Sequence, residues 1–172
     1  MKTKTIILIV IAFIVLILVH DKQENIVIPK ESIRIRIISN SNNDVDIAEK
    51  LKVRKKVEKE LYSLLKGVDD VSVARSIIND NLERLNVVID NTTEEKFDVK
   101  FGNNYFPEKV YKGVMYDAGE YESIVITLGS GTGENFWCVL FPPLCLLDEN
   151  DTTGDVEYKF FVKELLDKYV LK

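Results

Sequence analysis

The sequence predicts an α+β protein: an N-terminal export or anchor helix, then one domain with a strand, two helices, a β-rich middle and a C-terminal helix. Three patterns support this class. A continuous apolar run opens the chain, helical periodicity of apolar residues extends from about residue 45 to 90, and two-residue periodicity with frequent Gly and Pro follows from residue 96. With 172 residues, 46% of them apolar and 30% charged, the chain is long enough for one or two small folded domains.

The N-terminal segment has the pattern of an export signal. Fourteen consecutive apolar residues, Ile6 to Val19, follow Lys2 and Lys4. The run is short for a spanning helix, which needs roughly 20 apolar residues, and no small-residue cleavage site follows it. Residues 1–20 are therefore predicted as a signal peptide or a signal anchor, and both alternatives stay open. The N-terminal lysines predict that the rest of the chain is exported, with residues 21–31 as a tether and 32–172 as an extracytoplasmic domain.

The first elements of the domain are predicted as a strand and a long helix. Ser32 to Ile38 alternates charged and β-branched residues, which indicates a strand with Arg34 and Arg36 on one face. A cluster of Ser, Asn and Asp follows, and it predicts the start of a helix from Val45 to Lys66 that Gly67 ends. The apolar side of this helix comprises Ile47, Leu51, Val53, Val57, Leu61, Leu64 and Leu65.

Arg54 interrupts the apolar side of this helix. Two interpretations remain open. Arg54 contacts a partner or a buried carboxylate, or its methylenes pack on the core while the guanidinium reaches solvent. The second interpretation is favoured, and a buried ion pair would in any case be weak evidence for stability.

The remaining elements are predicted from the same periodicities. A second helix extends from Ser72 to about Asp90. An acidic loop, Asp148 to Asp155, precedes a final amphipathic helix from Asp155 to about Val170. The predicted strands between them are Phe97–Phe101, Lys109–Lys112, Tyr121–Leu128 and Val139–Phe141, the last ended by Pro142-Pro143.

The composition excludes several classes of function. Residues 21–172 hold 21 basic and 28 acidic side chains, a net charge of −7, which disfavours nucleic acid as a partner. One histidine, His20, and two cysteines do not make a zinc site. No catalytic set of residues is recognised either, so no metal, cofactor or small-molecule substrate is predicted. The loop from Gly129 to Glu134 lacks the Lys of a Walker loop, and its glycines are predicted to provide positive φ angles and close backbone approach.

The segment from Phe136 to Leu147 is almost wholly apolar and contains the single tryptophan, Trp137. Core packing, contact with a partner protein and contact with a membrane interface all remain open for it. Both cysteines, Cys138 and Cys145, lie within this segment. Because an exported domain enters an oxidising compartment, a disulfide between them is favoured over two buried thiols.

Two stretches carry a family resemblance: residues 117–121 (DAGEY) and residues 128–145 (LGSGTGENFWCVLFPPLC). They resemble the signature of the stage II sporulation protein R family, with Phe136 and Ser130 as departures. The resemblance covers roughly Pro29 to Leu147. It is supported further by Ile33–Ser41, Leu51–Arg54, Phe101-Gly102, Phe106-Pro107 and Lys109–Tyr111.

The resemblance implies a secreted signalling protein rather than an enzyme. Members are made in the forespore and exported into the space between the forespore and mother-cell membranes. There they are thought to activate a membrane-embedded aspartic protease, which removes the pro-sequence of sigma factor E. Arg54, Asn135, Phe136 and Trp137 are the predicted receptor contacts, because residues 135–137 form a polar-to-aromatic loop tip and Arg54 violates the apolar pattern of its helix.

Two alternatives from other classes remain. One is an exported cell-wall hydrolase with Asp117, Glu120 or Glu122 as the acid. The other is a structural protein of the spore envelope.

Overall fold

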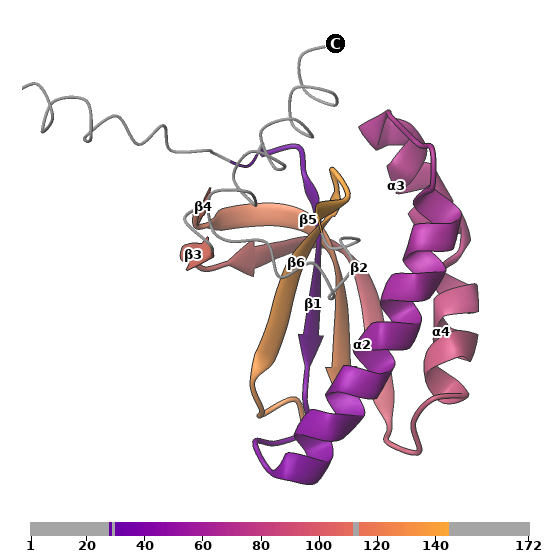
Figure 1. Ribbon diagram of the computed structural model, residues 1–172, viewed down its shortest axis with the longest axis vertical. Helices are drawn as coiled ribbons and strands as arrows, with labels where there is room; N and C mark the ends of the chain where they lie inside the picture. The colour runs from indigo at the N-terminus through magenta and orange to yellow at the C-terminus, as the bar shows by residue number, and fades with distance from the viewer. Residues whose placement is uncertain (1–27, 29, 112–113, 145–172) are drawn as a thin grey trace, which may run out of the picture.

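The computed structural model of the chain describes residues 28, 30–111 and 114–144 (Figure 1). The predicted leader, residues 21–27 and 29 of the tether, the acidic loop and the predicted final helix lie outside these residues. Within residues 28–144, apart from the gaps just given, no helix is long and apolar enough to cross a membrane.

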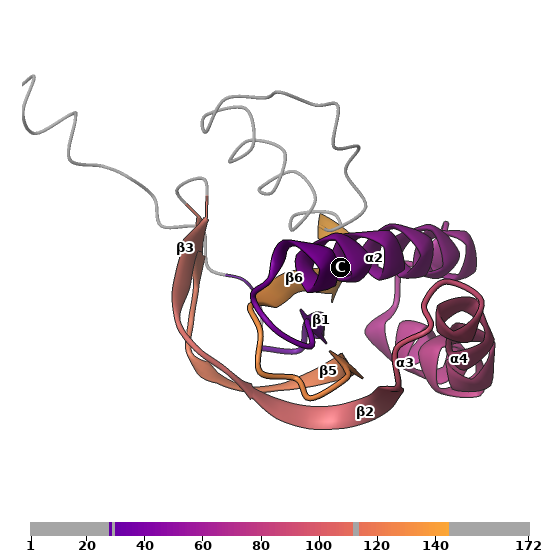
Figure 2. The same cartoon turned by 90° about the horizontal axis from the view of Figure 1, so that it is seen from below.

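A four-stranded mixed sheet organises the described domain. β1 lies in the middle, parallel to β5 on one side and antiparallel to β6 on the other. Figure 2 shows β2 and β5 curving away from the helices toward a separate two-stranded sheet, β3–β4. In spatial order the strands of the large sheet are β2 (Phe97–Phe106), β5 (Gly119–Leu128), β1 (Ile33–Ile38) and β6 (Asn135–Phe141), and the small sheet is β3 (Lys109–Tyr111) with β4 (Val114–Tyr116).

Three helices cover one face of the large sheet: α2 (Asp44–Leu65), α3 (Val71–Asp80) and α4 (Leu82–Asp90) (Figure 2). Successive strand residues point to opposite faces, so Ile33, Ile35 and Ile37 of β1 face the helices, whereas Arg34 and Arg36 face away. The core between the two layers is aliphatic, which makes burial of apolar surface its main stabilising term. Its fully buried members include Ile33, Ile35, Ile37, Val53, Val57, Leu61, Ala74, Ile78, Leu85, Ile89, Ile124 and Ile126.

The bounds of α2 follow from the residues that flank it. The Asn43 side chain accepts a hydrogen bond of 2.8 Å from the backbone N–H of Asp46, which satisfies a donor of the first turn. The helix ends at Leu65, and Gly67 follows with φ +80°. The predicted helix from Val45 to Lys66 is confirmed to within one residue at each end.

The single helix predicted from Ser72 to Asp90 is wrong, because Asn81 divides it into α3 and α4. Asn81 has φ −115° and ψ 14°, and its side-chain Nδ2 donates to the carbonyl of Ile77 at 2.8 Å. An asparagine side chain competes in this way with the helical backbone bonds. The apolar periodicity conceals the break, since Ile78 and Leu85 both face the same core. The predicted α+β class is confirmed for the described part, with three helices in place of two.

The prediction that Leu51 lies on the core side of the helix is wrong: Leu51 is 50% exposed, while its neighbour Lys50 is only 6% exposed. The Lys50 ammonium donates to the backbone carbonyl of Glu134 at 2.9 Å. This bond to a residue distant in sequence turns the polar Lys50 inward and leaves the apolar Leu51 outside. Burial of a lysine requires such a partner.

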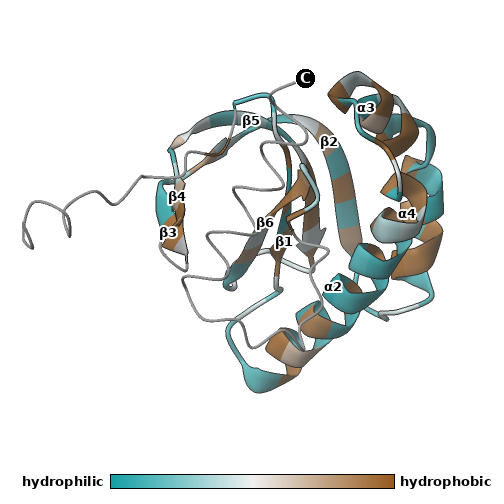
Figure 3. Cartoon of the chain, turned by 45° about the horizontal axis from the view of Figure 1, so that its top comes forward, coloured by the Kyte–Doolittle hydropathy of each residue, from teal (hydrophilic) through white to brown (hydrophobic). Residues whose placement is uncertain are grey.

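Three predicted strands are longer in the structure, and one was missed. β5 begins at Gly119, two residues before the predicted Tyr121. β2 continues past Phe101 to Phe106 because its Gly-Asn-Asn interior, which is typical of a turn, pairs with β5 without interruption. Figure 3 shows the alternating hydropathy along β2. β6 begins at Asn135, so the residues predicted as a loop tip are the first residues of a strand. The missed strand, Val114–Tyr116, is too short for its periodicity to indicate it.

The burial of α2 makes a direct prediction. Replacing Leu61 with alanine is expected to lower the free energy of unfolding by about 3 kcal/mol, because a fully buried leucine leaves a cavity. The same substitution at Leu51, on the same helix, is expected to change it by less than about 0.5 kcal/mol. Urea unfolding followed by circular dichroism measures both. Equal losses at the two positions would contradict this burial.

Candidate partner-binding site

Two loops far apart in the sequence interlock at one end of the sheet: residues 39–43, after β1, and residues 129–134, before β6. Asn40 is at the centre. Its side-chain oxygen accepts from the backbone N–H of Ser130 at 2.8 Å, and its carbonyl accepts from the N–H of Thr132 at 3.1 Å. Two further bonds join the loops, from the Gly133 N–H to the Ser39 carbonyl at 3.0 Å and from the Glu134 N–H to the Asn42 side chain at 2.6 Å.

The glycines of the second loop are required by this contact. Gly129 and Gly131 have φ values of +54° and +65°, which favour glycine. A Cβ on Gly133 would lie 2.3 Å from the carbonyl oxygen of Ser41, so no larger residue fits without a shift. The prediction of positive φ angles and close backbone approach is confirmed.

The start of α2 holds the same contact from the helix side. The Asp46 carboxylate accepts from the Ser41 hydroxyl at 2.6 Å and from the Asn40 amide at 3.0 Å. Lys50, one turn later, binds the Glu134 carbonyl as described above. The start of β6 at Asn135 is therefore held in place by bonds from both α2 and the loop after β1.

The side chains of β6 divide between the two faces of the sheet. Phe136 packs against the core beside the helices, opposite Ile37 of β1. Trp137 pairs with Arg36 in the register and faces the other way. We call this second surface the arginine face; it comprises Arg34, Arg36, Phe106, Tyr121 and Trp137.

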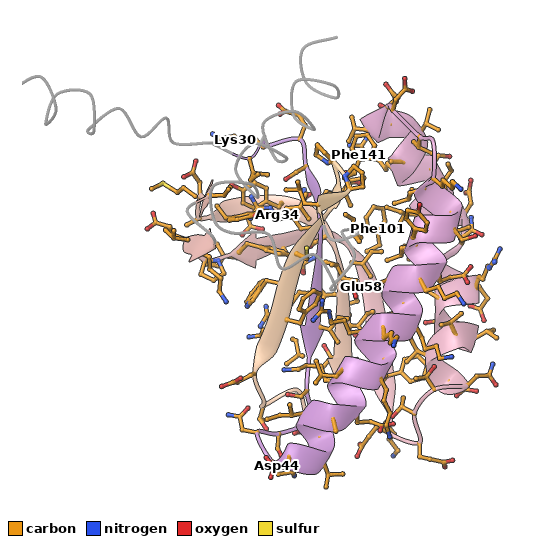
Figure 4. The ribbon with its side chains drawn as sticks, in the orientation of Figure 1. Lys30, Arg34, Asp44, Glu58, Phe101 and Phe141 are labelled. Atoms are coloured by element: carbon orange, nitrogen blue, oxygen red, sulfur yellow. The ribbon has the colours of Figure 1, made fainter. Side chains whose placement is uncertain are left out.

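Arg34 is the most buried charge of the arginine face, with 2% of its surface exposed. Its guanidinium carbon lies 3.3 Å from the ring centre of Tyr121 and 5.4 Å from that of Phe106, so aromatic rings replace water around the cation. Its Nε donates to Ser32 at 3.4 Å, whereas Nη2 has no hydrogen-bond partner. Burial lowers the pKa of Arg34. Figure 4 labels Arg34 on β1, on the side of the sheet toward β3–β4.

Trp137 is the half-exposed end of the same surface. Its ring packs edge-on against Phe106 with 4.8 Å between centroids. The Arg36 guanidinium carbon lies 4.5 Å and the Lys109 ammonium 5.6 Å from the indole ring centre. The Arg36 Nε also donates to the Asn135 side chain at 3.1 Å, and burial lowers the pKa of Arg36.

The two arginines of β1 differ from the other three arginines of the chain. Each of those three is paired with a glutamate: Arg54–Glu58 at 3.0 Å, Arg75–Glu122 at 2.7 Å, and Arg84–Glu60. In the described part of the chain, Arg34 and Arg36 form no ion pair with a carboxylate. Desolvation by burial outweighs the more distant Asp117 carboxylate at Arg34 and leaves its pKa lowered, so the positive charge of the arginine face is less well compensated than that of the three paired arginines.

The four predicted receptor contacts fall into two pairs on opposite sides of β6. Asn135 and Trp137 belong to the arginine side. Arg54 and Phe136 belong to the helix side, where the Arg54 guanidinium carbon lies 4.1 Å from the Phe136 ring centre and its Nε bonds Glu58. Arg54 is thus half-buried in an ion pair and a ring contact, rather than extended into solvent. A role of any of the four in partner binding stays a prediction.

The sequence alone does not predict a site at Arg34, Arg36, Phe106 and Tyr121. The alternation of β1 indicated that the two arginines share a face. The aromatic partners come from β2 and β5, and only the strand order brings them to β1.

The remaining predicted residues have separate environments. Cys138 is disulfide-bonded. Since Cys145 lies outside the described residues, its pairing with Cys138 stays a prediction. The carboxylate of Glu122, predicted as a possible acid of a hydrolase, accepts hydrogen bonds from the Arg75 Nε at 2.7 and 2.8 Å. These bonds raise the pKa of Arg75. Among the described residues, no group of three or more His, Cys, Asp or Glu side chains is placed to hold a metal ion.

Fold and site together define an α+β protein with a preorganised aromatic and cationic surface, typical of protein recognition. The chain belongs to the stage II sporulation protein R family, whose sequence model matches residues 29–151. It is similar to the stage II sporulation protein R of Bacillus subtilis (strain 168), with 42% identity over 135 residues. That match covers 74% of this chain and 60% of the relative, so the chain spans less than two thirds of the relative's length. No solved structure matches the chain.

The loop contact predicts a large effect of Asn40. Replacing Asn40 with alanine is expected to lower the free energy of unfolding by about 2 kcal/mol, because it removes the acceptor for Ser130 and a donor to Asp46. The matched control is Asn103→Ala, an exposed asparagine of β2, with an expected change below about 0.5 kcal/mol. Urea unfolding followed by Trp137 fluorescence measures both, and an Asn40 variant as stable as the control would refute the central role of this contact.

Proposed function

We propose that this protein is a secreted intercompartmental sporulation signal. It is exported from the forespore, as a released protein or anchored by residues 1–20, into the space between the two membranes. There it activates a membrane-embedded aspartic protease of the mother cell, and the protease removes the pro-sequence of sigma factor E. Family membership supports the place in sporulation. The receptor, the location and the activation step are parts of the proposal.

The observation that carries the proposal is the setting of Trp137. The only tryptophan of the chain is half-exposed, contacts two cations and lies on a strand whose start is fixed by the interlocked loops. An aromatic side chain held in this way loses little conformational entropy on binding. Tryptophan and arginine are also the residue types that contribute most at protein interfaces.

Activation requires a difference in affinity between two states of the receptor. A signal that bound the inactive and active forms equally would shift nothing. In the proposed mechanism the domain binds the active, dimeric arrangement of the protease more tightly. Asn135 and Trp137 contact it from the arginine side, and Arg54 and Phe136 from the helix side of the same strand.

The first test is Trp137→Ala. It is expected to abolish processing of pro-sigma-E in sporulating cells and to leave the domain exported and folded, because the side chain is only partly buried. Tyr105→Ala is the matched control, since Tyr105 is an aromatic residue of β2 that is 58% exposed. It is expected to signal normally. Normal processing with the Trp137 variant would remove the main support for the proposal.

Arg54→Ala tests the helix side of the strand. We expect it to abolish processing while lowering the free energy of unfolding by only about 1 kcal/mol, the value of one ion pair and one cation–π contact at a half-buried position. Immunoblots of pro-sigma-E and urea unfolding give the two readouts. Normal processing with this variant would confine the receptor contact to the arginine side.

A further inference from the structure

Among the residues that the structure describes, strand β6 is an edge of the sheet and carries none of the charged residues that usually protect an edge. In the described part of the chain it pairs only with β1. Exposed edges are normally blunted by charged residues, which prevent another strand from adding. The opposite edge, β2, has such residues, since Asp98 and Lys100 are exposed and form an ion pair at 2.8 Å. The seven residues of β6, Asn-Phe-Trp-Cys-Val-Leu-Phe, include no charge.

The first residues of β6 direct backbone groups toward the open edge. Ser39, next to β1, exchanges backbone bonds with the loop before β6: its N–H donates to Glu134 at 3.3 Å and its carbonyl accepts from Gly133 at 3.0 Å. Pairing alternates along an antiparallel ladder, so Phe136 directs its backbone groups toward β1. Asn135 and Trp137 then direct their N–H and C=O groups away from β1. These two residues form a short strand-binding edge.

The charge beside this edge specifies the partner. Arg36 and Lys109 contact the Trp137 ring, and neither is paired with a carboxylate in the described part of the chain. Burial already lowers the pKa of Arg36, so a carboxylate beside it would restore the solvation that the guanidinium has lost. Arg34, one pleat away, has an unsatisfied buried nitrogen on the same face.

We propose that the receptor protein binds by adding an extended acidic segment as a strand to the edge at Asn135–Trp137. Backbone bonds to these two residues supply affinity, and a carboxylate on the arginine face meets Arg36 and Lys109. This inference rests on the proposed function and specifies how the receptor is recognised.

The single tryptophan makes the backbone contact measurable. Labelling the full chain with ¹⁵N-tryptophan gives one backbone amide, that of Trp137, and one indole N–H. Hydrogen exchange is run with the chain alone and with vesicles that carry the mother-cell protease, quenched at low pH, and read by NMR. Strand addition is expected to slow exchange of the backbone amide at least 100-fold in the presence of the protease.

The outcomes separate this inference from the proposed function. Binding to the protease vesicles without slowing of the Trp137 amide overturns strand addition and leaves the signalling role standing. No binding to the protease vesicles over empty ones overturns both. Protection of the Trp137 amide in the chain alone also overturns the inference. If it is present at all concentrations, the chain itself occupies the edge. If it appears only at high concentration, a second copy occupies the edge.

A charge reversal tests the chemistry of the partner. Lys109→Glu is expected to weaken binding to the protease vesicles about tenfold, because it places a carboxylate where the partner's carboxylate lies. Lys100→Glu, the same change at the exposed opposite edge, is expected to leave binding within twofold. Equal effects of the two variants, or tighter binding with Lys109→Glu, would overturn the acidic character of the partner.

Discussion

The contact between the loop after β1 and the loop before β6 is the constraint on which the rest of the structure depends. Asn40 binds the second loop through both its side chain and its carbonyl, and Asp46 and Lys50 connect the pair to the first turns of α2. These bonds bring together residues about 90 positions apart in the sequence. They fix where β6 begins, and therefore which of its residues face the helices. A shift of one residue would exchange the environments of Phe136 and Trp137.

The two faces of β6 differ in how they compensate positive charge. On the helix side, Arg54 has both a carboxylate and a ring. On the arginine side, Arg34 and Arg36 rely on rings, one hydroxyl and one amide. A buried guanidinium without a carboxylate loses much of its hydration, and cation–π contacts of about 1–2 kcal/mol offset only part of that loss. The arginine side is therefore less well compensated, and a carboxylate from a partner is stabilised there.

The sequence predicted the elements whose signals are local. α2 was placed within one residue because Asn43 and Gly67 mark its ends. The break at Asn81 was missed because the apolar periodicity continues through it. The inward position of Lys50 and the arginine face could not be predicted, since their partners lie on distant strands. Three of the predicted receptor contacts, Asn135, Phe136 and Trp137, are neighbours in the predicted loop. In the strand, Phe136 faces the opposite side from Asn135 and Trp137, because adjacent residues of a strand face opposite sides.

An edge strand without charged residues carries a risk of self-association, and the cations beside β6 counteract it. If two copies joined edge to edge through β6, Arg36 and Lys109 of each copy would be brought close to those of the other. Such like-charge contacts cost energy, and the net charge of −7 on residues 21–172 adds a general repulsion between copies. An acidic strand meets the opposite situation at the same edge, because its carboxylates neutralise the local cations. The same two cations that disfavour a second copy at this edge thus favour an acidic partner.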